Sequence, residues 1–98
     1  MAEQRERYAA ITGWGHYLPE RVLTNADLER MVATNNEWIM SRTGIRERRI
    51  AAPDETTATI GAQAGRKALA VANLDPTDLD LIIVATATPD YFFPSTAC

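Results

Sequence analysis

The chain has 98 residues, of which 46% are hydrophobic and 23% charged, and its formal net charge is −3. This length allows at most one small domain, and the composition is typical of a soluble globular chain. The negative charge argues against a nucleic-acid binder held by a global positive field. Cys98 is the single cysteine, so no intramolecular disulfide can form. The lack of a signal-peptide hydrophobic region indicates a reducing, cytoplasmic location, and no apolar run is long enough to span a bilayer. We therefore expect neither a membrane nor a nucleic-acid partner.

The first third of the chain predicts a strand and a helix. Residues 1–10 begin with a polar stretch and are expected to be a disordered terminus. The apolar run at residues 8–12, followed by two glycines, predicts a short buried strand that enters a turn, and residues 17–20 continue as a loop. The stretch Thr24–Asp27 has the pattern of a capping box, so we expect a helix over residues 25–32.

A second helix is expected to begin at Asn35. Thr34 and Glu37 have the spacing of a capping box, in which a hydroxyl and a carboxylate satisfy free N–H groups at a helix start. Gly44 is expected to end this helix, because glycine readily adopts the left-handed conformation found after helix C-termini.

Trp38 and Arg42 lie four residues apart and therefore share one face of this helix. An indole that can stack on a base, beside a guanidinium that can stack or hold phosphate, suits a ligand that carries a nucleotide. The alternative is a tryptophan half-buried against the core and an arginine in water. The residues by themselves leave both interpretations open.

Residues 44–50 alternate without a clean apolar face, which predicts an exposed or edge strand. Together with Arg42, the three arginines of this run could extend a phosphate-binding surface. The alternative is a solvated run that is partly neutralised by Glu37 and Glu47.

The second half of the chain predicts a helix followed by a buried strand. The helix is expected over residues 57–72, with a stripe of mostly small side chains that would let it approach a neighbour closely. The run 79–86, rich in isoleucine, valine and leucine, predicts a strand buried on both faces, and its position after a helix indicates a sheet that is parallel in part. Residues 94–98 predict the start of another helix. The small-residue stripe comprises Ile60, Ala64, Ala68 and Val71, with Gly61 and Ala72 beside it.

Cys98 is a candidate nucleophile, because it lies near a predicted helix start, where the helix dipole lowers a thiol pKa. Nucleophilic cysteine catalysis needs a base, and the single histidine, His16, lies in a distant glycine-rich loop without a companion motif. We therefore favour a structural role for Cys98 as a small buried hydrophobic residue. One cysteine and one histidine do not make a metal site by themselves.

Three segments of the sequence resemble a known family. The segments GWGHYLPERVLTNADLERMV, EWIMSRTGIRERRIA and FPSTAC together look like the N-terminal third of β-ketoacyl-acyl carrier protein synthase III, the condensing enzyme that starts type II fatty acid synthesis. The resemblance covers residues 11–98. The second and third segments separate this family from the elongating condensing enzymes.

The resemblance implies an α/β fold of the thiolase-like kind, with layers α/β/α/β/α, a mixed sheet and a homodimeric assembly. Residues 11–98 would form the N-terminal part of one half of that fold, incomplete as a domain. In the family an acyl group passes from acetyl-CoA or a related primer to a cysteine, and malonyl-acyl carrier protein is decarboxylated to condense with the thioester. The catalytic cysteine, histidine and asparagine lie beyond Cys98, which matches a structural cysteine instead. Acyl-CoA is a substrate, and no cofactor is implied.

The resemblance assigns ligand-binding roles to four residues. Trp38 and Arg42 match the residues that sandwich the adenine of CoA, and Thr34 matches the residue beside that ring. Phe93 matches a position that reaches into the acyl pocket of the partner subunit and limits primer length. Tyr91 and Phe92 depart from the common sequence of the family, so the primer range stays open.

Three interpretations remain at this stage. The first is a synthase III acyltransferase seen through its N-terminal segment. The second is a non-catalytic CoA-binding or dimer-forming module. The third is a related CoA-primed synthase that makes a secondary metabolite.

Overall fold

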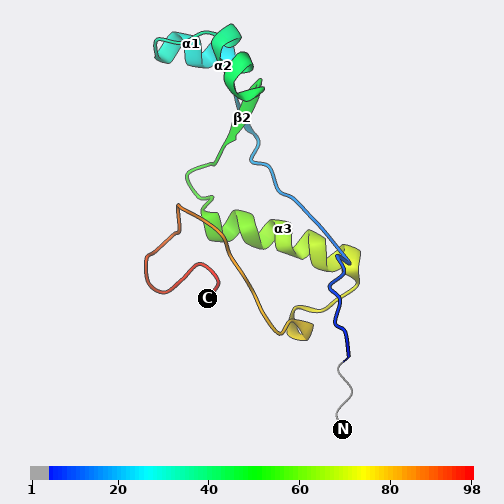
Figure 1. The fold of residues 1–98 in the computed structure, drawn as a ribbon. Coiled ribbons are helices and arrows are strands. Elements are labelled where there is room, and N and C mark those ends of the chain that lie inside the picture. Colours follow the sequence, from blue (N-terminus) through cyan, green and yellow to red (C-terminus); the bar gives the residue numbers. More distant parts are fainter. Residues whose placement is uncertain (1–4) are drawn as a thin grey trace.

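The molecule is elongated, with a hairpin unit of residues 21–50 at one end and a long helix nearer its middle (Figure 1). The computed structural model describes residues 5–98 and measures 67 × 31 × 27 Å along its principal axes. The expectation of a disordered terminus falls partly on residues 1–4, which lie outside the described residues. The elements in chain order are β1 (Arg21–Thr24), α1 (Asn25–Met31), α2 (Asn36–Thr43), β2 (Glu47–Ile50), α3 (Thr57–Ala72) and the 3-10 turn η1 (Pro76–Asp78).

The hairpin unit is built around an antiparallel pair of short strands. β1 pairs with β2 so that Arg21 faces Ile50 and Thr24 faces Glu47. β2 lies within the edge strand expected at residues 44–50. β1 was missing from the sequence interpretation, because four residues that run directly into a helix cap carry almost no strand signal of their own.

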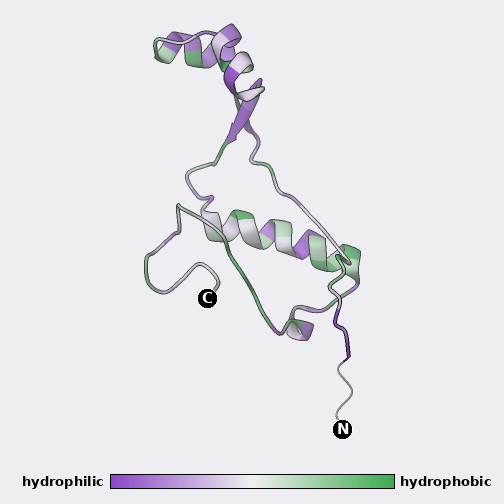
Figure 2. Ribbon diagram, viewed as in Figure 1, coloured by the Kyte–Doolittle hydropathy of each residue, from purple (hydrophilic) through white to green (hydrophobic). Residues whose placement is uncertain are grey.

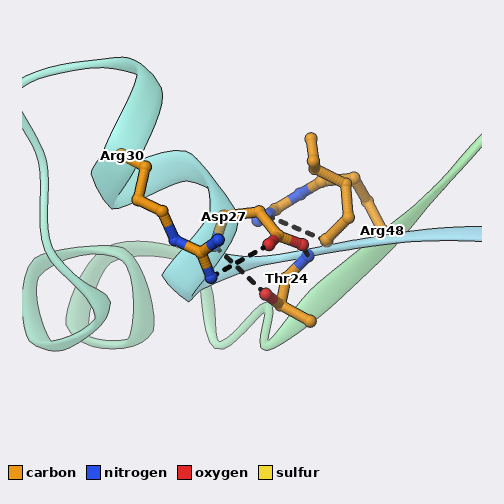
Figure 3. Close-up of polar contacts among 5 residues, drawn as sticks. Thr24, Asp27, Arg30 and Arg48 are labelled. Carbon is orange, nitrogen blue, oxygen red and sulfur yellow. Dashed lines mark hydrogen bonds and ion pairs between the residues drawn. The ribbon is translucent and has the colours of Figure 1, made fainter.

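The capping box at the start of α1 is present as expected (Figure 3). The Thr24 hydroxyl accepts a hydrogen bond from the Asp27 N–H at 3.2 Å, and the Asp27 carboxylate accepts one from the Thr24 N–H at 2.9 Å. The bond from the Thr24 N–H to the carboxylate, with the Thr24 hydroxyl beside it, holds the pKa of Asp27 below its usual range. Arg30 adds an ion pair with Asp27 at 3.4 Å. α1 ends at Met31, one residue before the predicted end.

α3 has the predicted bounds and the predicted close neighbour, and that neighbour is the N-terminal segment. A β-carbon added to Gly13 would lie 2.4 Å from the Ala68 carbonyl oxygen and 2.9 Å from the Ala72 β-carbon. Gly15 makes a similar approach to Ala64. The stripe is therefore rotated slightly from the expected one: Ala72 is part of the contact, and Val71 is 58% exposed.

The two strands expected at residues 8–12 and 79–86 are not formed in the described chain. Both segments are extended but unpaired, and Ile11 and Ile83 are 85% and 81% exposed. The physical reason is that a strand buried on both faces needs neighbours, and the described residues supply none. In Figure 2 the segment that follows η1 is coloured mostly green, which marks hydrophobic residues.

The direction of these two segments nevertheless agrees with a parallel arrangement. The first segment places Gly13 beside the C-terminal end of α3 and Gly15 one turn nearer its start. The second leaves η1 and ends where Thr88 and Asp90 contact the first turn of α3. Both therefore run opposite to α3 and in the same direction as each other.

Little of the described chain is buried. Among residues 5–98 the buried residues are Pro19, Asn25 and Ile39, and Ile39 is 7% exposed. The helix expected at residues 94–98 is a turn, closed by a hydrogen bond from the Cys98 N–H to the Ser95 carbonyl. None of the helices in residues 5–98 combines the length and the apolar character needed to cross a bilayer.

Candidate functional site

The helix that carries Trp38 begins one residue later than expected. Asn35 is the N-cap of α2, and its side-chain oxygen accepts a hydrogen bond from the Trp38 N–H at 2.7 Å. The proposed capping box of Thr34 with Glu37 is wrong, because asparagine is at least as good an N-cap as threonine and occupies the next position. Thr34 lies just outside α2, half-buried. Gly44 ends the helix in the left-handed conformation, with φ of 68°, as predicted.

Trp38 and Arg42 share one face of α2, and their side chains are in contact. The guanidinium carbon of Arg42 lies 5.8 Å from the centroid of the Trp38 ring, within the range of a cation–π interaction. The Trp38 side chain is 54% exposed, so it is not packed into a core. In this state one face of the indole already carries a planar cation. A flat ligand can therefore reach that face only by replacing or moving the guanidinium.

Both arginines of β2 donate hydrogen bonds to backbone carbonyls of the facing segment. Arg48 donates to the Leu23 carbonyl at 3.4 Å (Figure 3), and Arg49 donates to the Pro19 carbonyl at 2.9 Å. These two side chains hold the hairpin together. Neither Glu37 nor Glu47 forms an ion pair within residues 5–98, where Arg30 with Asp27 is the single pair. Of the four arginines that could have extended a phosphate-binding surface, Arg48 and Arg49 are thus engaged within the hairpin.

Asn25 is a residue of this region that sequence reasoning missed. It is the first residue of α1 and is buried, with 2% exposed. Its side-chain nitrogen donates to the Asn36 side-chain oxygen at 2.8 Å and to the Ile45 carbonyl at 2.9 Å. Its side-chain oxygen accepts from Arg48 at 2.9 Å. The capping pattern had identified Asn25 only as a helix residue, and its partners lie 11 to 23 positions away.

The loop that contains Phe93 lies away from α2, in the part of the chain coloured orange to red in Figure 1. Phe93 is 92% exposed. The loop is tied to α3 because the Ala58 N–H donates to the Asp90 carboxylate at 2.9 Å and the Thr57 hydroxyl donates to the Thr88 carbonyl at 2.6 Å. The structure therefore does not bring Phe93 together with Trp38 within one chain.

Cys98 is exposed, so the burial expected for it is not found in the described chain. Its sulfur lies 3.5 Å from the Ser95 hydroxyl oxygen. Within residues 5–98, no three histidine, cysteine, aspartate or glutamate side chains are grouped so that they could hold a metal ion.

A pocket of about 740 Å³ lies between the hairpin unit and α3, away from Trp38 and Arg42. At its wall the Tyr17 hydroxyl donates a hydrogen bond to the Glu55 carboxylate. This bond raises the pKa of Tyr17 and lowers that of Glu55. The ammonium of Lys67 lies 5.7 Å from the centroid of the Tyr17 ring. These contacts of Tyr17 with Glu55 and Lys67 join the segment before β1 to the segment before α3 and to α3 itself.

No protein-family model matches the chain. It is 65% identical, over 91 residues, to a protein of Roseiflexus castenholzii named β-ketoacyl-acyl carrier protein synthase III, with 93% of this chain and 28% of the relative covered. A protein of Caldanaerobacter subterraneus with the same name is 61% identical over 90 residues, which is 27% of its length. The chain thus spans less than a third of the curated relatives it matches, at their N-terminal end.

Solved structures agree with these relatives. The crystal structure of 3-oxoacyl-acyl carrier protein synthase III from Aquifex aeolicus matches with a TM-score of 0.84 and 59% identity, over 90% of this chain and 28% of that one. The priming β-ketosynthase of the R1128 polyketide pathway matches with a TM-score of 0.86 and 38% identity, over 99% of this chain and 29% of that one. The expected fold class is confirmed: the described chain has the conformation of the N-terminal part of a thiolase-like α/β fold.

Proposed function

We propose that this chain, which belongs to the β-ketoacyl-acyl carrier protein synthase III family, acts as part of a condensing enzyme that joins an acyl-CoA primer to malonyl-acyl carrier protein with loss of CO2. The family membership rests on the identity to the relatives, and the reaction rests on the names of those relatives. Acetyl-CoA is the primer we favour. The product would start a fatty acid in the cytoplasm, and the enzyme would work as a homodimer.

In the proposed reaction the chemistry takes place on residues outside this chain. A cysteine thiol gives its proton to a base and attacks the acyl thioester, and CoA leaves as a thiol after taking up that proton. Malonyl-acyl carrier protein then loses CO2, and the carbanion attacks the acyl-cysteine thioester to form the new carbon–carbon bond and release the cysteine. Covalent catalysis needs a nucleophile with a base in hydrogen-bond reach, and the partner of the exposed Cys98 sulfur is the Ser95 hydroxyl at 3.5 Å, which is not a base.

The contribution of this chain is the binding of the primer's nucleotide. The observation that carries the proposal is the exposed Trp38 indole with the Arg42 guanidinium 5.8 Å from its centroid. A base stacks on the indole, and Arg42 moves to cover the base or to hold a phosphate. Thr34, one residue before the N-cap of α2, lies beside the base. Phe93, exposed on its loop, enters the acyl pocket of the partner subunit and limits primer length.

Replacing Trp38 with alanine tests this role in the full-length gene product. We expect binding of the CoA primer to weaken by about 1 to 3 kcal/mol, the usual contribution of one base stacked on an aromatic ring. Malonyl-acyl carrier protein carries no adenine, so its KM should change little while the KM for acyl-CoA rises about 5- to 150-fold. Circular dichroism checks that the variant is folded. Equal losses for both substrates would contradict the nucleotide role and favour a structural one.

A second candidate function is a CoA-primed synthase of secondary metabolism. The similarity to the priming β-ketosynthase of a polyketide pathway over 99% of this chain favours it. Tyr91 and Phe92 are bulky, largely exposed side chains next to Phe93, the residue proposed to limit primer length. Turnover is measured with acetyl-CoA against longer and branched acyl-CoA primers: a preference for acetyl-CoA supports the first function, and a preference for another primer supports the second.

The remaining alternative is a CoA-binding or dimer-forming module without a nucleophile. The reading frame after Cys98 decides between this module and an enzyme. An Ala-Cys-Ala-Gly-like motif within about one further strand and loop supports the enzyme. A stop codon at position 99 supports the module.

A further inference from the structure

Asn25 holds both ends of the helix that carries Trp38 and Arg42. One of its two donated hydrogen bonds reaches Asn36, the first residue of α2, and the other reaches the carbonyl of Ile45, just after the helix has ended. The same side chain accepts from Arg48 on β2, and its backbone N–H donates to the Arg46 carbonyl at 3.2 Å. A single side chain therefore fixes α2 relative to α1 and β2.

The burial of this side chain makes its bonds important for the orientation of α2. With 2% of Asn25 exposed, water cannot replace a lost partner, and an unpaired buried group is costly. The start of α2 has one further tie to α1, a bond from the Asn36 N–H to the Glu29 carboxylate at 2.6 Å. That bond is exposed to solvent. At the end of α2, α1 is tied through Asn25, by the side-chain bond to Ile45 and the backbone bond to Arg46.

We infer that Asn25 is a positioning residue of the nucleotide-binding face: it sets the orientation of α2 so that Trp38 and Arg42 meet the nucleotide of the primer. The inference rests on the proposed function. Asn25 touches neither the ligand nor the reacting atoms. Its loss weakens the binding of substrates that carry the nucleotide and does not change the binding of substrates that lack it.

The test compares acyl-CoA with acyl-pantetheine, which has the same thioester and arm but no nucleotide. Asn25→Asp, made in the full-length gene product, replaces the donating amide nitrogen by an oxygen that faces two acceptors, Asn36 and Ile45. We expect the KM for acyl-CoA to rise about five- to tenfold, because two donated hydrogen bonds are lost and part of their cost falls on ligand binding, with kcat and the KM for acyl-pantetheine unchanged. Equal changes for the two thioesters, or none, would overturn the inference.

A second variant keeps the test valid if Asn25→Asp does not fold. Asn36→Ala removes only the acceptor on α2, from an exposed position, and we expect the same selective loss in a smaller amount. Tyr17→Phe is the matched control, because it removes a side-chain hydrogen bond to Glu55 that does not involve α2, and it should not separate the two thioesters.

Trp38→Ala, measured in parallel, separates a failure of the proposed function from a failure of the positioning role of Asn25. If Trp38→Ala fails to discriminate between the thioesters, the proposed function fails. If Trp38→Ala discriminates and both Asn25→Asp and Asn36→Ala do not, the positioning role alone fails.

Discussion

At the scale of single residues, Arg42 has a geometry that lysine cannot reproduce. Its planar guanidinium lies over the Trp38 ring at 5.8 Å, so it can cover a flat ligand as it now covers the indole. We expect Arg42→Lys to weaken acyl-CoA binding by about 0.5 to 1 kcal/mol, or roughly two- to fivefold, because the ammonium keeps the charge and loses the planar face. Calorimetric titration with acetyl-CoA measures this. Arg30→Lys, on the neighbouring helix, is the control and should bind normally, and unchanged binding by Arg42→Lys would show that only charge matters.

At the scale of elements, the contact between the N-terminal segment and α3 depends on glycine. Gly13→Ala would place a β-carbon 2.4 Å from the Ala68 carbonyl oxygen, a distance that real contacts do not reach. We expect a loss of about 1 to 3 kcal/mol in the free energy of unfolding of the full-length gene product, the usual cost of overpacking. Urea denaturation measures it. Thr12→Ala adds no atom near α3 and should cost less, so equal costs would mean that the close approach is not the cause.

The stability of the protein depends on pH through Asp90, whose carboxylate accepts a hydrogen bond from the first turn of α3. Hydrogen bonds from the Thr56 side chain and the Ala58 N–H hold the pKa of this carboxyl below its usual range. A lowered folded-state pKa stabilises the protein above the unfolded-state pKa of about 3.9, and this contribution is lost as the pH falls through the folded value. We therefore expect Asp90→Asn to lower Tm at pH 7 and to lower it progressively less as the pH falls below the unfolded-state pKa. A Tm difference that stays constant over this range would contradict the role of the charge.

At the scale of the whole molecule, the described residues bury too little apolar surface for an independent fold. The radius of gyration is 19.0 Å, against about 13 Å for a compact domain of this length, and Phe92 is fully exposed. We expect the isolated 98-residue chain to lack a cooperative unfolding transition and to bind hydrophobic dyes. Chemical denaturation followed by fluorescence tests this. A sharp transition of a monomer would show that the chain rearranges to bury these segments.

The sequence by itself determined the ends of the helices to within one residue. Thr24 and Gly44 act through hydrogen bonds and backbone angles that involve positions only a few residues away, so the local pattern is enough to identify them. The shared face of Trp38 and Arg42 follows from helix geometry in the same way, and the structure confirms their contact.

Tertiary structure decided whatever depends on a distant partner. The strand β1 exists because β2 returns beside it some 25 residues later, and Arg48 became a structural residue because Leu23 and Asn25 lie next to it. The apolar runs at 8–12 and 79–86 show the converse, since their composition predicts strands but a strand forms only where another strand pairs with it. Hydrogen bonds between segments far apart in sequence leave no local pattern, and for that reason the role of Asn25 became visible only in the folded chain.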